Sequence, residues 1–256
     1  LETIKIPKTI KNIGNYAFMQ ASYLAFYSLT PPTLHGTFGY YGTILVPSEA
    51  YENYVNEWGS SLIDTLPVQK TYEAINGLFY EYSPGADTAI VSHTTNWDWE
   101  PYAASYITIP STVTIYGAEY SVTAIGRDAF KGCKNLISVS IPESVKSIEP
   151  SAFAYSTITT LTLPENLTKI GSMAFSDCEN LKSLQIPNTV TVIDVAAFQD
   201  CSGLTSINIP ENLTVIKRVA FAQCSGVTSI TIPESVTTIE EGAFQLCSGL
   251  KSITIT

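Results

Sequence analysis

The sequence repeats itself with a fixed period, and this feature constrains the fold more than any other. "IPENLTVIKRVAFAQCSGV" begins at Ile209, and "IPESVTTIEEGAFQLCSGL" begins 23 residues later, at Ile232. A fixed period of roughly 20 to 50 residues is typical of stacked repeat architectures. An Ile/Leu-Pro pair marks each unit, and a phenylalanine follows eleven residues after the proline at Phe18, Phe153, Phe175, Phe198, Phe221 and Phe244.

Each repeat unit is predicted to contain a short strand that ends at its proline. Ile207 and Ile209 alternate with polar residues, which is the period of a strand with one buried face. Pro210 stops the strand because proline has no N–H for a ladder hydrogen bond. Glycine or asparagine precedes the next unit, and these residue types tolerate positive φ. We therefore expect the chain to reverse in the left-handed conformation at Asn135, Asn180, Gly203, Gly226 and Gly249.

The residues that recur in every unit are interpreted as core layers rather than as a catalytic site. One unit cannot bury its own apolar face, but stacked units can. The spacing L-x-x-I-x-I-x-x-N is that of leucine-rich repeats. The predicted fold class is therefore a leucine-rich-repeat β-solenoid of units about 23 residues long, with short parallel strands, mostly β and irregular structure and few short helices. The repeat phenylalanines should stack in one buried column.

The five cysteines share one phase of the repeat. Each lies three residues after the repeat phenylalanine, at Cys133, Cys178, Cys201, Cys224 and Cys247. Stacked cysteines point the same way rather than at one another, which disfavours disulfide geometry. We predict an unlinked ladder of free, buried thiols that behave as small hydrophobic side chains. His35 and His93 have no metal-ligand spacing beside them, so no metal site is predicted.

The array is interrupted, which divides the chain into two predicted parts. Residues 1–70 are interpreted as the end of a first array with a terminal cap, which includes a helix at about 48–58. Residues 71–256 are interpreted as a second array that begins with a hairpin cap at 71–105, in which Leu78–Tyr82 pairs with Thr88–Val91. A hairpin insertion is expected at 112–123, where the unit is nine residues longer, and uncapped repeats then continue to the C-terminus.

Composition and motifs argue against several functional classes. Net charge is −10, and the 13 lysines and arginines are scattered rather than gathered into the basic stripe of a nucleic-acid-binding protein. The apolar runs are shorter than a membrane span, so no membrane insertion is predicted. The sequence contains no G-x-S-x-G, no phosphate-binding loop and no Cys/His pair. We therefore predict that the protein is not an enzyme and needs no cofactor.

The aromatic residues suggest one candidate ligand-binding surface. Fourteen of the fifteen tyrosines and all three tryptophans precede residue 121, and they are densest in "NWDWEPY" at 96–102. Two other interpretations remain open for this stretch: a cap that shields the first coil, or a weak cation site at Asn96, Asp98 and Glu100 without a known calcium motif. The outward Ser and Thr columns of the strands are either a hydrogen-bonding surface or simply good stacking residues. The candidate ligand-binding residues are Trp97, Asp98, Trp99, Tyr102 and Tyr106.

The unit "L-x-x-I-x-I-P-x-x-V-x-x-I-x-x-x-A-F-x-x-C" resembles the leucine-rich repeats of BspA-like proteins of gut and oral bacteria. The likeness covers residues 106–256 closely and 1–29 well. "TILVPSEAYENYVNEWG" is similar to that family's terminal cap, and "YGAEYSVTAIG" to its first-repeat insertion. The resemblance implies secretion or cell-surface display, adhesion, and host matrix, plasma or bacterial surface proteins as partners. The predicted function is a non-catalytic extracellular binding module with protein ligands favoured over glycans; the alternatives are a structural spacer and a carbohydrate-binding module.

Overall fold

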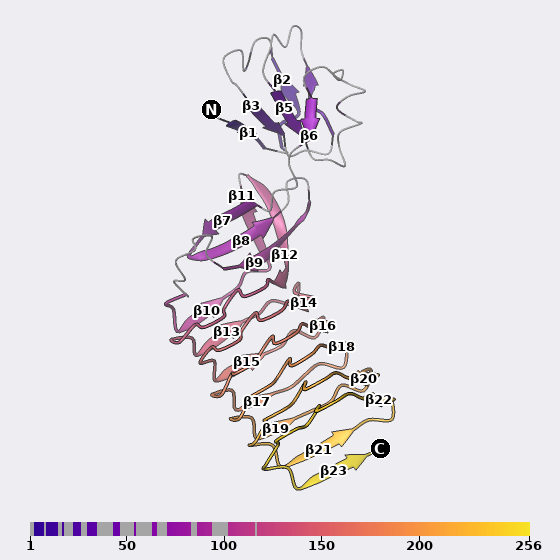
Figure 1. Ribbon diagram of the computed structural model, residues 1–256. Helices are drawn as coiled ribbons and strands as arrows, with labels where there is room; N and C mark the ends of the chain where they lie inside the picture. The colour runs from indigo at the N-terminus through magenta and orange to yellow at the C-terminus, as the bar shows by residue number, and fades with distance from the viewer. Residues whose placement is uncertain are drawn as a thin grey trace. The chain divides into compact units, whose positions relative to one another are not determined.

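A computed structural model gives the fold (Figure 1). The chain forms two compact units, one made of Leu1–Glu73, Tyr82–Ala89 and Thr112–Ser121, the other of Ala74–Glu81, Ile90–Ser111 and Val122–Thr256. Most of the helix predicted at about 48–58 lies outside the described residues, although Tyr54 within it is buried. The structure describes residues 3–7, 9–14, 17, 23–26, 30–34, 43–46, 54, 63–65, 71–82, 86–93, 102–115 and 117–256.

The N-terminal strands form two parallel sheets. The larger sheet has the order β1 (Thr3–Ile6), β3 (Tyr23–Phe26), β5 (Thr43–Val46) and β6 (Ile63–Thr65). The smaller sheet pairs β2 (Asn12–Ile13) with β4 (Thr33–Leu34). Ile4 lies beside Leu24, and Leu24 lies beside Ile44, so equivalent apolar residues of successive coils share a register. This is the arrangement in which stacked coils bury a common apolar face.

Residues 71–125 contain two tight turns between strands. β7 (Thr71–Ile75), β8 (Leu78–Tyr82) and β9 (Thr88–Ser92) are successive neighbours in one sheet, and β12 (Ala118–Ile125) lies on the other side of β9. Asn76 and Gly77 join β7 to β8 with φ of 51° and 79°, as a two-residue hairpin turn requires. β11 (Thr112–Ile115) pairs antiparallel with β12, with Ile115 opposite Ala118.

The remaining chain is a β-solenoid in which each turn contributes one strand to each of two parallel ladders (Figure 1). The predicted fold class is confirmed. The front sheet consists of β10 (Tyr106–Thr108), β13 (Ser138–Ser140), β15 (Thr160–Thr162), β17 (Ser183–Leu184) and β19 (Ser206–Ile207), and a separate pair β21 (Ser229–Ile232) and β23 (Ser252–Ile255) follows. The back sheet continues from β12 through β14 (Ser147–Ile148), β16 (Lys169–Ile170) and β18 (Val192–Ile193), and a separate pair β20 (Val215–Ile216) and β22 (Thr238–Ile239) follows.

The third side of each turn is built around the repeat phenylalanine. The Phe198 N–H donates to Ala220 O at 2.8 Å, and the Phe221 N–H donates to Ala243 O at 2.9 Å. The residues two before and two after each phenylalanine have positive φ, as at Val219 (49°) and Gln223 (62°). Their N–H groups also donate to the next turn. These hydrogen bonds between turns stabilise a left-handed backbone conformation that is otherwise unfavourable for residues with a Cβ.

The sequence prediction that the chain reverses in the left-handed conformation before each unit was wrong. Asn135, Asn180, Gly203, Gly226 and Gly249 all lack positive φ. The glycines serve a close approach of backbones instead. A Cβ on Gly203 would lie 2.1 Å from Glu179 O, one on Gly226 would lie 2.4 Å from Leu204 O, and one on Gly249 would lie 2.1 Å from Ser225 O. Each is glycine because a methyl group would collide with the preceding turn.

We expect Gly203→Ala to lower the free energy of unfolding by about 1–3 kcal/mol, the usual cost of overpacking a close contact. The added methyl group must push Glu179 O away, and that carbonyl belongs to the main chain rather than to a side chain that could rotate. Asn180→Ala is the matched control, because it changes the same repeat position where a side chain is already accommodated. Urea unfolding of both variants measures the difference. Equal stabilities would contradict the close-approach explanation.

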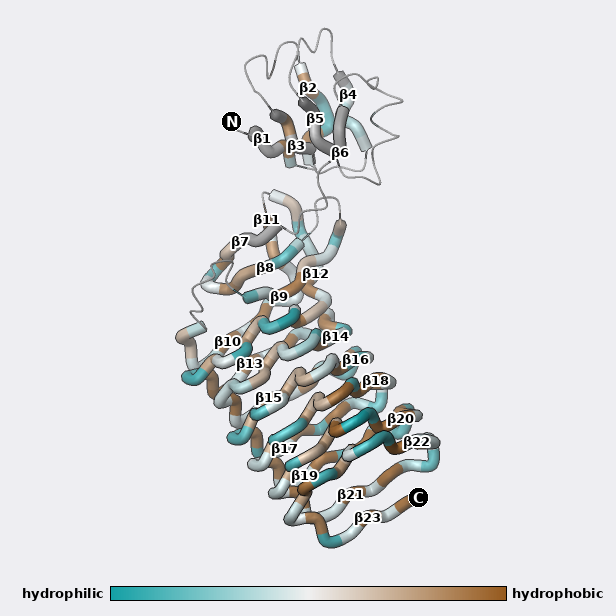
Figure 2. The backbone as a smooth tube through the Cα atoms, in the orientation of Figure 1, coloured by the Kyte–Doolittle hydropathy of each residue, from teal (hydrophilic) through white to brown (hydrophobic). Residues whose placement is uncertain are grey.

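The repeat phenylalanines form the predicted column. Phe130 and Phe153 stack with ring centroids 5.1 Å apart, and the spacing stays between 5.2 and 5.7 Å through to Phe244. Rings from Phe153 onward are inclined by no more than 9° to one another. Hydrophobic segments recur at corresponding places in successive turns (Figure 2). The column is thus a continuous apolar axis along the turns.

Candidate functional site

The structure describes two of the five candidate ligand-binding residues, Tyr102 and Tyr106. Trp97, Asp98 and Trp99 lie outside the described residues. The Tyr102 hydroxyl donates to Ser92 O at 2.6 Å and accepts the Phe79 N–H at 2.9 Å. Its ring centroid lies 5.2 Å from that of Phe130. Tyr102 therefore extends the phenylalanine column by one ring, and burial raises the pKa of its hydroxyl well above the ordinary value.

Tyr106 is placed differently, on the outward face of the front sheet. It begins β10, and 72% of its surface is exposed. Tyr106 is in register with Ser138, which starts an outward column of hydroxyl residues on successive strands. That column continues at Thr160, Ser183 and Ser206. Tyr106 therefore presents an accessible aromatic ring at one end of a row of hydroxyl groups.

The front sheet offers hydrogen bonds but little acid–base chemistry. Its inward residues are buried and apolar, as at Ile107, Val139 and Leu161, while the outward positions between them are polar. The outward columns contain no charged side chain. Among the residues that the structure describes, no three His, Cys, Asp or Glu side chains come together as a potential metal site. This surface is suited to recognising uncharged polar groups of a ligand.

The cysteines form the predicted ladder of free, buried thiols. In four of the five, Sγ donates to the carbonyl oxygen of the phenylalanine one turn earlier: Cys178 to Phe153 and Cys201 to Phe175, both at 3.1 Å. Cys224 and Cys247 repeat this contact at 3.2 and 3.1 Å. Burial raises the pKa of Cys178 from 9.0 to about 11 and that of Cys224 to about 12. The thiols are therefore protonated at neutral pH and poor nucleophiles.

We expect the native protein to react slowly with a thiol reagent at pH 7.5, because the reactive thiolate is both scarce and shielded. The same reagent in denaturant without reductant should count five free thiols. Cys247 is the most exposed of the five, at 9%, and should react first in the folded state. A Cys247→Ala variant identifies its contribution. A count of four or fewer in denaturant, or immediate reaction of the native thiols, would contradict the ladder.

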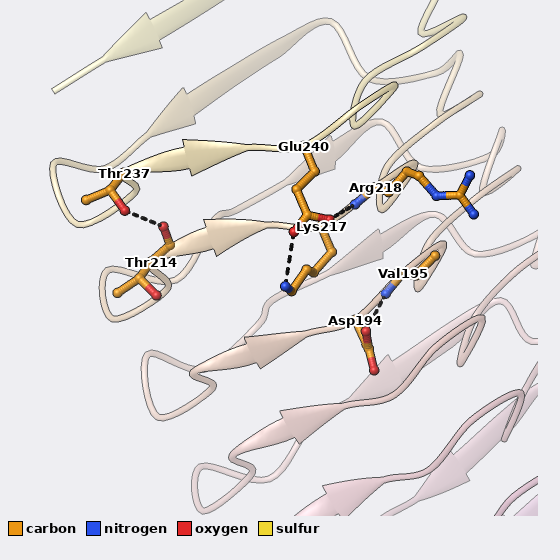
Figure 3. Close-up of polar contacts among 7 residues, drawn as sticks. All are labelled: Asp194, Val195, Thr214, Lys217, Arg218, Thr237 and Glu240. Atoms are coloured by element: carbon orange, nitrogen blue, oxygen red, sulfur yellow. Dashed lines mark hydrogen bonds and ion pairs between the residues drawn. The ribbon is translucent and has the colours of Figure 1, made fainter.

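Two carboxylates beside the strands of the back accept backbone hydrogen bonds, and one of these bonds comes from the preceding turn (Figure 3). The Glu240 carboxylate accepts the Arg218 N–H at 2.9 Å and lies 3.0 Å from Lys217 Nζ. These two contacts, the backbone N–H first, lower the pKa of Glu240. Asp194 Oδ1 accepts the Val195 N–H at 2.8 Å. Both carboxylates thus satisfy backbone donors, which is a structural use rather than an arrangement for general acid–base catalysis.

Within the described part of the chain, no helix is long and apolar enough to span a bilayer.

Comparison with known proteins gives a family and a fold. The model of the "BspA type Leucine rich repeat region" matches six copies over residues 1–36, 103–225 and 174–256. A leucine-rich repeat protein of Bacteroides ovatus is 25% identical with a TM-score of 0.54, over 71% of this chain and 52% of that one. The T. pallidum leucine-rich repeat protein is 24% identical with a TM-score of 0.55, over 67% of this chain and 87% of that one. No curated protein matches.

Proposed function

Because the chain belongs to the family of BspA-type leucine-rich repeat proteins, we propose that it is a non-catalytic binding module of a bacterial surface or secreted protein. The proposed location is extracellular, as the resemblance to BspA-like proteins implies. The chain spans about half of the B. ovatus protein that it matches, so the proposal concerns this module and not a whole protein. Protein ligands are favoured, with host matrix or bacterial surface proteins as the partners to test first.

The proposal rests on the different roles of the residues that recur in every turn and the residues that do not. Phe198, Cys201 and Gly203 occupy positions of the repeat that have structural roles. Phe198 stacks in the core, the Cys201 thiol donates a hydrogen bond, and Gly203 allows a close approach of two backbones. Tyr106 stands at the end of its column of small hydroxyl residues and is exposed. Solenoid proteins bind their ligands on an extended surface that is supported by such a repeated core. The proposed binding role is therefore given to residues outside the repeat pattern, Tyr106 among them.

The chemistry of the candidate surface favours a protein ligand. Trp97, Trp99 and Tyr106 are aromatic, and aromatic residues are the commonest energetic anchors of protein interfaces. Asp98 adds a carboxylate that could pair with a basic side chain of the partner. The neighbouring hydroxyl columns lack both aromatic and arginine anchors, so they contribute complementarity rather than most of the affinity. Tyr102 contributes by holding the end of the column rather than by direct contact.

A structural spacer is the second candidate, and one observation favours it. Hydroxyl side chains bond to the turn before them, as Thr168 Oγ1 does to Lys146 O at 3.0 Å and Thr157 Oγ1 does to Lys134 O at 2.7 Å. Such hydroxyls are used inside the stack and are not available to a ligand. A carbohydrate-binding module is the third reading, and the glycan arm of the experiment below distinguishes it.

We expect the purified chain to bind a member of an array of extracellular-matrix proteins, and the Trp97→Ala, Trp99→Ala double variant to lose most of that binding. Truncating an aromatic anchor typically costs about 2 kcal/mol or more, which is a loss of roughly thirty-fold in affinity for each residue. Ser183→Ala with Ser206→Ala is the matched control, because it removes two exposed hydroxyl groups from the front sheet. That control should bind nearly as well as the unmodified chain.

Thermal unfolding of all variants accompanies the binding measurement. The double tryptophan variant should retain the cooperative unfolding of the solenoid, which separates loss of a ligand contact from loss of fold. Undiminished binding by that variant would reduce the aromatic stretch to a cap. Binding only on a parallel glycan array would replace the protein ligand with a carbohydrate. Binding to neither array would favour the spacer.

A further inference from the structure

Three hydrogen-bond ladders connect successive turns of the solenoid, and two of them are interrupted around the turn Leu204–Gly226. The front sheet ends at β19 and resumes as the separate pair β21–β23. The back sheet ends at β18 and resumes as the separate pair β20–β22. The two interruptions are one turn apart, on opposite sides of the same turn.

On the front, the interruption removes one regular contact between neighbouring turns. The Thr205 N–H donates to Lys182 O at 3.1 Å, and the Lys251 N–H donates to Thr228 O at 2.9 Å. The equivalent bond from the Thr228 N–H to Thr205 O is missing from the described stretch 117–256. The last strand of one block and the first strand of the next are therefore not joined by the contact that their neighbours make.

On the back, the same comparison identifies Lys217. The Asp194 N–H donates to Ile170 O at 3.0 Å, and the Glu240 N–H donates to Ile216 O at 2.9 Å. Within residues 117–256, all of which the structure describes, no bond joins the Lys217 N–H to Ile193 O. The turn Leu204–Gly226 is thus tied on its front only to the turn before it, and on its back only to the turn after it.

The third side is continuous through both interruptions. The Phe198 N–H and the Phe221 N–H each donate to the following turn, and the rings of Phe198, Phe221 and Phe244 stack at 5.4 and 5.7 Å. This side keeps its apolar contacts as well as its backbone bonds. It can therefore serve as an axis about which the two less connected sides separate.

Asn208 modifies the last step of the front sheet, between β17 and β19, on the side of the preceding turn. In the first coil, the Ile109 N–H donates to a backbone oxygen, Ser140 O, at 3.0 Å. At the equivalent place, the Ile186 N–H donates to the side-chain oxygen Asn208 Oδ1 at 2.8 Å. Asn208 Nδ2 donates back to Ile186 O at 2.8 Å. The side-chain amide replaces the backbone of residue 208 in the ladder, and β19 stops at Ile207.

We propose that the turn Leu204–Gly226 is a hinge of the solenoid, with the phenylalanine side as its axis. Opening there changes the spacing between Ser206 and Ser229, which begin β19 and β21 on the two sides of the front interruption. The hinge gives the solenoid an adjustable surface without loss of its core. The inference concerns the chain alone and does not rest on the proposed binding function.

Residue-resolved amide hydrogen exchange tests the hinge, because amides exchange through local openings and unbonded ones exchange fastest. Each amide at an interruption has matched controls one turn away. We expect Thr228 to exchange at least about ten-fold faster than Thr205 and Lys251, and Lys217 at least about ten-fold faster than Asp194 and Glu240, after correction for intrinsic rates. Similar protection at all of these amides would overturn the hinge.

Discussion

Phe221→Ala should lower the free energy of unfolding by about 3–5 kcal/mol, the usual cost of removing a fully buried aromatic side chain. Phe221 is 0% exposed, and its ring stacks on Phe198 at 5.4 Å and on Phe244 at 5.7 Å. The backbones of the neighbouring phenylalanines are held by the hydrogen bonds that connect successive turns on this side. They cannot collapse into the vacated space without breaking those hydrogen bonds, so most of the cavity should remain.

Equilibrium unfolding in urea measures this loss, and two other substitutions calibrate it. Phe244→Ala should cost less, because Phe244 is half-buried and its ring has one neighbour in the column. Tyr155→Ala should cost least, because 42% of that side chain is already exposed. An unchanged melting temperature for Phe221→Ala, or a smaller loss than for Tyr155→Ala, would contradict the core assignment.

The repeat phase was sufficient to predict the core from the sequence. Residues that share a phase must share a column once the units stack, and this places Phe175 above Phe198 and Cys201 beside Cys224 without any other information. The thiol spacing follows from the same argument, because side chains in one column point the same way. Both predictions depended on periodicity alone, and both were confirmed.

The backbone conformations could not be predicted in the same way. Glycine fits a positive φ and also fits a close approach, and its presence at Gly203 does not say which applies. The left-handed positions fall instead at residues such as Met173, Ala196 and Val219, whose side chains do not favour that conformation. The Val219 N–H donates to Glu241 O at 3.1 Å. This hydrogen bond joins Val219 to the next turn, and no local sequence pattern predicts it.

Two features near the start of the second array show different limits of the sequence. Asn76–Gly77 carries the commonest sequence signal for a two-residue hairpin turn, so the sequence itself indicates the pairing of β7 with β8. The position of Tyr102 could not be predicted from the sequence. It lies in the same aromatic stretch as Trp97 and Trp99, and only its contacts with Phe130, Ser92 and Phe79 distinguish a column end from a binding residue.

Two deletions test most directly the claim that each 23-residue unit is one interchangeable layer of the scaffold. Deleting residues 181–203 removes one whole unit and joins Asn180 to Leu204 in the same phase of the repeat. Deleting residues 181–192 removes about half a unit and shifts every following residue out of its column. In a solenoid, stability is approximately a sum over units and their interfaces, so an in-phase deletion shortens the stack but preserves its packing.

Circular dichroism and thermal unfolding of the two deletion variants, measured beside the full chain, give the answer. We expect the in-phase variant to keep the β-sheet spectrum and a cooperative transition, with a melting temperature somewhat below that of the full chain. The out-of-phase variant should lose the cooperative transition of the second array, because Phe198 and the residues after it no longer meet their partners. Equal loss of structure in both variants would contradict the account, since the units would then not be equivalent layers.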